Sequence, residues 1–120
     1  MAESSMQSKN ETATTTICCV LLQSLCTPRF SVFACKIRDK HSRKQATFHI
    51  RQPARLKEPT LERAITYLTN DCQTIAHCAN FREWASAKRI GMDEDAEAVY
   101  REKLRNYDRF IKLFGTKSIT

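Results

Sequence analysis

The feature that most constrains this fold is a change in the spacing of apolar residues between residues 51 and 59. In Phe30–Arg38, the apolar residues Phe33, Cys35 and Ile37 alternate with Val32, Ala34, Lys36 and Arg38. In Ala46–Arg51, every second residue is apolar. This alternation places the two sets of side chains on opposite faces of a strand. From Pro59 onwards, apolar residues recur every three or four positions, which is the period of one helix face. We therefore expect an α+β chain, with strands first and helices after them.

The two alternating segments predict an antiparallel β-hairpin, because the polar linker Asp39–Gln45 suits an open tip. One face of this hairpin is apolar and carries Phe33, Cys35, Ile37, Ala46, Phe48 and Ile50. The opposite face carries Lys36, Arg38, His49 and Arg51, with Lys40, His41, Arg43 and Lys44 at the tip.

An apolar run, Ile17–Leu25, precedes the hairpin and is too short for periodicity to separate a strand from a helix. Its β-branched start and its end at Thr27-Pro28 favour a strand. The region of about 17–51 is therefore expected to be a short hairpin or a three-stranded meander.

The helical part is expected to contain two or three helices, over about 59–79, 80–90 and 93–114, that form a helical hairpin. Gly91 and Gly115 are expected to end the second and third helices, since glycine is favoured just past a helix C-terminus. The apolar stripe of the third helix is predicted to comprise Ala96, Val99, Tyr100, Leu104, Tyr107, Phe110, Ile111 and Phe114.

A chain of 120 residues corresponds to about one small domain. Residues 1–16 are polar and rich in Ser and Thr, which predicts a disordered N-terminal tail. We expect residues 17–115 to form a single α+β domain and residues 116–120 a C-terminal tail.

Six cysteines raise the question of a disulfide framework, but their spacing leaves the last 42 residues without a cysteine. The apolar run after residue 16 lacks a short basic segment before it, and Arg29 interrupts any longer span. Without a secretory or membrane segment, we expect reduced thiols that serve as small core residues. The predicted location is cytoplasmic or nuclear, with no membrane partner.

The positive charge is concentrated in one stretch of the sequence. The formal net charge is +7, from 20 basic and 13 acidic side chains. Between Arg29 and Lys57 there are nine basic residues and one acid, Asp39, so this stretch carries +8 and the rest of the chain −1. Dense charge of one sign is typical of a surface that binds a polyanion.

We interpret this stretch as the surface by which a small accessory or regulatory protein binds RNA or DNA phosphates, largely independently of the nucleic-acid sequence. Because Phe33 and Phe48 fall on the apolar face, the pattern favours backbone contacts over base stacking. RNA and DNA are not distinguished. The predicted nucleic-acid-binding residues are Lys36, Arg38, Lys40, Arg43, Lys44, Arg51, Arg55 and Lys57.

The alternative is a non-enzymatic interaction adaptor whose C-terminal amphipathic helices bind another protein or a second copy of the chain. In that case the basic hairpin only protects a sheet edge, or keeps the protein soluble or nuclear. Part of the stripe over residues 107–114 would then be a dimer seam.

No metal or catalytic site is predicted. Cys26, Cys35, His41 and His49 are too widely spaced for the paired ligands of a zinc site, and Cys72, His77 and Cys78 diverge around a helix. The chain has two glycines and no phosphate-binding loop or nucleophile motif. We therefore expect no cofactor and no enzymatic activity.

Overall fold

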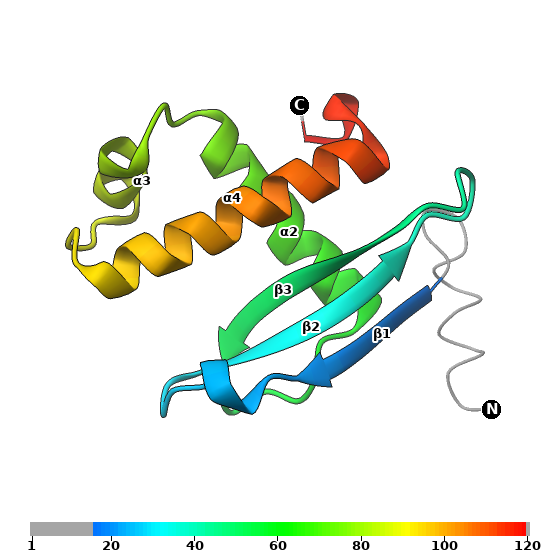
Figure 1. The fold of residues 1–120 in the computed structure, drawn as a ribbon, viewed down its shortest axis with the longest axis horizontal. Helices are drawn as coiled ribbons and strands as arrows, with labels where there is room; N and C mark the ends of the chain where they lie inside the picture. Colours follow the sequence, from blue (N-terminus) through cyan, green and yellow to red (C-terminus); the bar gives the residue numbers. More distant parts are fainter. Residues whose placement is uncertain (1–15, 120) are drawn as a thin grey trace. The chain divides into compact units, whose positions relative to one another are not determined.

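The computed structural model describes residues 16–119, and the chain divides into two compact units. One reaches to Tyr67 and the other starts at Leu68. Three antiparallel strands are followed by three helices, so the predicted α+β arrangement is confirmed (Figure 1). The predicted N-terminal tail lies outside the described residues apart from Thr16.

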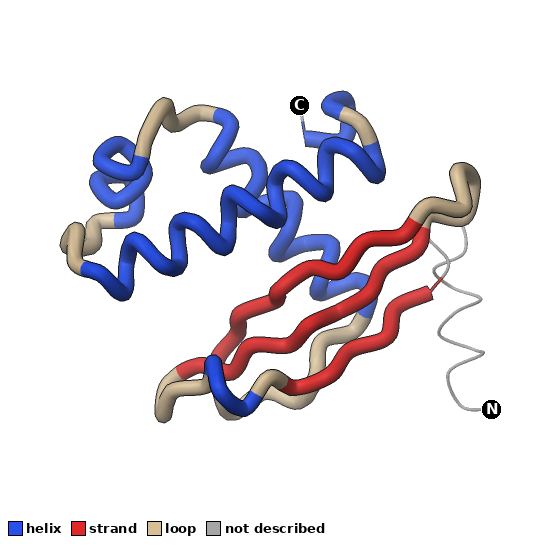
Figure 2. The backbone as a smooth tube through the Cα atoms, viewed as in Figure 1, coloured by secondary structure: helices blue, strands red, loops and turns tan. Residues whose placement is uncertain are grey.

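The first unit contains a three-stranded meander, one of the two arrangements expected. The strands are β1 (Thr16–Leu21), β2 (Phe30–Arg38) and β3 (Gln45–Pro53), in the order β1-β2-β3 (Figure 2). The apolar run Ile17–Leu25 is thus a strand in its first part, and the short 3-10 helix η1 (Gln23–Leu25) follows.

The alternation of β2 and β3 separates two faces of the sheet, as predicted. The register pairs Phe33 with Ile50 and Cys35 with Phe48, and all four are buried. We call this side, with Ile37 and Gln52, the core face. The other side, which we call the open face, carries Lys36, Arg38, Ala34, Thr47, His49 and Arg51.

One residue departs from this separation. Val32 has the parity of the open face, yet its exposed fraction is 0%. It lies at the end of the sheet where η1 contacts β2, and the Leu22 N–H donates a hydrogen bond to the Val32 carbonyl (2.8 Å). The open face is therefore covered at Val32, whereas its exposed basic residues Lys36 and Arg38 lie towards the hairpin tip.

The second unit is helical. It holds the end of α2 (Leu61–Ala76), together with α3 (Phe81–Lys88), α4 (Glu94–Phe114) and the 3-10 helix η2 (Thr116–Ile119). Trp84 is buried, and its ring centroid lies 5.3 Å from that of Tyr100. An ion pair between Asp71 and Lys103, at 2.8 Å, joins α2 to α4.

Polar side chains explain where the helices begin. The Thr60 hydroxyl accepts a hydrogen bond from the Arg63 N–H, so α2 begins after Thr60 rather than at Pro59 (3.1 Å). Asn80 and Asp93 cap α3 and α4 in the same way, at 2.9 and 2.8 Å. At its other end, α2 stops at Ala76, three residues before the predicted end.

The predicted stripe of α4 is correct only in part. Ala96 and Phe110 are buried, but Leu104 is 37% exposed. The buried face of α4 also includes Leu113 and the polar residues Glu102 and Asn106. The spacing of apolar residues does not reveal buried polar residues. The predicted stripe is therefore rotated slightly around the helix axis, away from the face that is buried.

The expected glycine cap of α3 is wrong. The left-handed residue after this helix is Arg89 (φ 59°), and Gly91 does not have a positive φ. Arg89 and Ile90 donate their N–H groups to carbonyls of the last turn of α3. Gly115 ends α4 with φ 87°, as predicted.

We expect Arg89→Gly to stabilise the protein by about 0.5–1 kcal/mol, because glycine adopts the left-handed conformation without a steric cost. Arg89→Ala removes the same side chain and keeps the strain, so it serves as the control. Urea unfolding would measure both. Equal stability of the glycine and alanine variants would contradict this reading of the cap.

Candidate nucleic-acid interface

The open face brings basic side chains of β2 into line with the hairpin tip. Lys36 and Arg38 are exposed and two residues apart, so they point the same way at a separation of about 7 Å. Arg38 pairs with Gln45 at the last step of the β2–β3 ladder, next to the tip. Arg51 is half-buried on the same face, opposite Val32 and away from the tip.

The tip itself is a closed turn rather than an open loop. The Asp39 N–H donates to the Lys44 carbonyl (2.8 Å), and the Arg43 N–H donates to the Asp39 carbonyl (2.9 Å). Arg43 adopts a left-handed conformation (φ 64°) that closes the turn. As a result, Lys40, Arg43 and Lys44 are all exposed on a hydrogen-bonded turn.

The single acid of this stretch is engaged with the turn. The Asp39 carboxylate accepts hydrogen bonds from the backbone N–H groups of His41 (3.4 Å) and Ser42 (3.3 Å). Partial burial opposes ionisation, but hydrogen bonds from the Ser42 hydroxyl and these N–H groups hold the pKa of Asp39 below its usual value. Asp39 therefore stabilises the turn that carries the basic side chains.

Most basic side chains of the tip and of β2 have no acidic partner among residues 16–119. Within residues 16–119, no ion pair joins Lys36, Lys40, Arg43 or Lys44 to a carboxylate.

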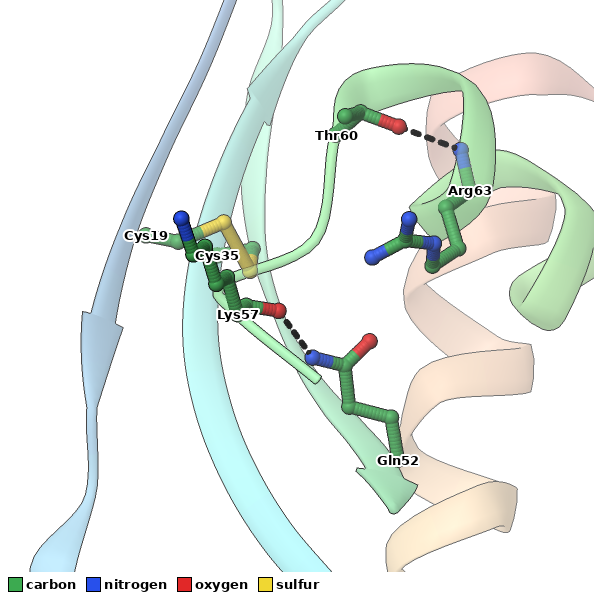
Figure 3. Close-up of a disulfide and its surroundings, with 6 residues drawn as sticks. All are labelled: Cys19, Cys35, Gln52, Lys57, Thr60 and Arg63. Atoms are coloured by element: carbon green, nitrogen blue, oxygen red, sulfur yellow. Dashed lines mark hydrogen bonds between the residues drawn. A yellow bond between two sulfur atoms is a disulfide. The ribbon is translucent and has the colours of Figure 1, made fainter. Parts of the chain in front are cut away.

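Arg55 and Lys57 lie apart from the other predicted contacts. Gln52, a core-face residue, donates its side-chain N–H to the Lys57 carbonyl, so the connection after β3 passes the core face (Figure 3). The basic surface formed by the open face and the tip therefore consists of Lys36, Arg38, Lys40, Arg43, Lys44 and Arg51, without Arg55 and Lys57.

The expectation that all cysteines are reduced is wrong for one pair. Cys19 of β1 and Cys35 of β2 form a disulfide between paired residues on adjacent strands (Figure 3). Sequence spacing did not reveal this pair because it depends on the β1–β2 register. The cytoplasmic or nuclear location stays a prediction, and it loses the support that reduced thiols would have given it.

The remaining four cysteines, Cys18, Cys26, Cys72 and Cys78, are free thiols. Burial, followed by the nearby Asp71 carboxylate, raises the pKa of Cys72 to about 12, so this thiol stays protonated at neutral pH. Cys35, one of the metal ligands weighed above, is bonded to Cys19. Among the described residues, no group of three His, Cys, Asp or Glu side chains is placed to hold a metal ion.

Sequence reasoning missed one aromatic residue of the open face. Phe30, at the start of β2, is 38% exposed, and the Arg29 guanidinium lies 5.9 Å from its ring centroid. Phe33 and Phe48 are buried, as predicted. Extending the alternation of β2 by two residues would have placed Phe30 on the open face.

Comparison of the chain with protein-family models, curated proteins and solved structures found no match. Within residues 16–119, none of the helices combines the length and the apolar character needed to cross a membrane.

We expect Asp39→Ala to destabilise the hairpin by about 1 kcal/mol, because two backbone N–H groups lose their acceptor. Asp39→Asn keeps an acceptor oxygen and removes the charge, so it should cost less. The low pKa of Asp39 means that its ionised form stabilises the fold above its unfolded pKa. This contribution is lost as the pH falls through the folded pKa. Urea unfolding at pH 7 and pH 3 measures it, and equal costs of the alanine variant at both would contradict this role.

Proposed function

We propose that this protein binds nucleic acid through the phosphate backbone, with the open face and the hairpin tip as the contact surface. The observation that supports it best is the exposure of Lys36, Lys40, Arg43 and Lys44 without carboxylate partners within residues 16–119. Phosphate contacts supply affinity and position the protein, but they carry no sequence information directly. We therefore propose binding that is largely sequence-tolerant.

Besides the charge, two features of the geometry support the proposal. The basic residues sit on a sheet and a hydrogen-bonded turn, so their backbone positions are set before binding. The one acid of the stretch is held by the turn, with its carboxylate directed at backbone N–H groups.

A salt titration tests this proposal. The logarithm of the affinity for a mixed-sequence oligonucleotide should fall linearly with the logarithm of the salt concentration, with a slope set by the number of phosphates neutralised. The triple variant Lys40→Glu, Arg43→Glu, Lys44→Glu should reduce that slope by about two to three. Fluorescence anisotropy at several salt concentrations measures both proteins.

A matched control reverses three exposed basic residues of the helical unit, Arg82→Glu, Lys88→Glu and Arg105→Glu. The net charge changes by the same amount, so an effect of total charge would appear in both variants. The proposal requires a much larger loss from the hairpin variant. Equal losses, or weak binding of the unaltered protein at low salt, would contradict it and leave the adaptor as the better account.

A single variant separates loss of binding from loss of the fold. Arg43→Gly removes a charge at a left-handed position, where glycine relieves backbone strain. It should weaken binding while the unfolding midpoint stays the same or rises.

A further inference from the structure

The outer edge of β1 is unlike the other surfaces of the sheet. Within residues 16–119, β1 is an edge strand, bonded to β2 on one side only. Its sequence, Thr-Ile-Cys-Cys-Val-Leu, contains no charged residue. Cys18 is exposed, and the exposed fractions of Val20 and Leu21 are 59% and 36%.

The register shows which backbone groups of β1 point outward. The Leu22 N–H donates to the Val32 carbonyl, and this pair continues the β1–β2 register. Because hydrogen-bonded and non-hydrogen-bonded pairs alternate in an antiparallel ladder, the even-numbered residues of β1 bond to β2. The 4.0 Å separation of the Cys19 and Cys35 Cα atoms agrees, since non-hydrogen-bonded pairs are the closer ones. The N–H and C=O groups of Ile17, Cys19 and Leu21 therefore face away from β2.

The composition of β1 does not match an edge position. Edge strands are usually protected by charged residues, proline or a bulge, and β1 has none of these. A continuous apolar run is typical of a strand with both of its faces buried. By contrast, β2 alternates apolar and basic residues as expected for a sheet with one open face.

We propose that a second copy of this chain pairs with β1 along this edge, antiparallel and two-fold symmetric, to give a six-stranded sheet in the order β3-β2-β1-β1-β2-β3. A second β1 is self-complementary, since it offers the same outward groups and no charge. This inference does not depend on nucleic-acid binding.

Charge favours the antiparallel arrangement. Each copy carries the exposed basic residues Lys40, Arg43 and Lys44 at the hairpin tip, residues 39–44, at one end of the sheet. Antiparallel pairing places the two tips at opposite ends, whereas parallel pairing would place them at the same end and increase repulsion. The two-fold axis then runs perpendicular to the sheet, so both open faces lie on the same side.

One symmetric register forms hydrogen bonds at every outward-facing residue. It pairs Ile17 with Leu21 of the second copy, and Cys19 with Cys19 of the second copy. Six hydrogen bonds then cross the seam. In this register Cys18 lies opposite Val20 of the second copy, in a non-hydrogen-bonded pair with close side chains.

The oligomeric state of the full chain tests the proposal. Sedimentation equilibrium without nucleic acid should show a monomer–dimer equilibrium that shifts towards dimer as salt screens the positive charge. Ile17→Pro removes an outward N–H and leaves the bonds to β2, so it should raise the dimer dissociation constant by about tenfold or more. Val20→Lys, at an exposed position, should do the same by charging the edge.

Cross-linking tests the register. Mild oxidation of Val20→Cys should give a disulfide-linked dimer through Cys18 of the second copy. The double variant Val20→Cys, Cys18→Ser is the control and should not cross-link in this way. Circular dichroism of each variant verifies that the chain is folded.

Three results would overturn the proposal. The first is a monomer at all concentrations and salt conditions, with rapid exchange of the Ile17, Cys19 and Leu21 amide hydrogens. The second is a monomer in which these amides are protected, because a segment of the same chain would then cover the edge. The third is a dimer that Ile17→Pro and Val20→Lys leave unchanged.

Discussion

The pairing of β2 with strands on both sides is the constraint on which the sheet depends. Its register places Phe33, Cys35 and Ile37 on one face, where they are buried, and this leaves Lys36 and Arg38 no position except the open face. A shift of one residue would exchange the two sets and bury two cations. Hydrophobic burial on one side of the strand thus determines where the positive charge is exposed.

The same strand, β2, is linked to β1 by a disulfide and to β3 by the turn that carries the basic side chains. On one side, Cys35 is bonded to Cys19 and holds β1 in register. On the other, β2 and β3 meet at a turn that Asp39 closes with its backbone and side chain. The acid in the basic stretch is therefore a structural residue, which reconciles a concentrated charge of +8 with an ordered tip.

The sequence was most informative where one physical effect dominates. Alternation in β2 and β3 predicted their faces, because one side must be buried and the other is charged. It could not identify the Cys19–Cys35 bond, since Ile17–Leu25 has no alternation from which to read a register. It also missed Glu102 and Asn106 as buried residues and Arg89 as a left-handed cap, because tertiary packing overrides local preference at these positions. For the candidate interface, the residue types were predictable, but the separation of Arg55 and Lys57 from the tip required the path of the chain after β3.

We propose that one face and one turn of the sheet form the nucleic-acid contact. An NMR titration of the labelled full chain with a mixed-sequence oligonucleotide tests this proposal residue by residue. Our account predicts that chemical-shift changes concentrate at residues 36, 38 and 40–44, with smaller changes at His49 and Arg51. Core-face residues such as Phe48 should be little affected. Changes centred on the helices over residues 81–104, or none in the hairpin, would contradict the account.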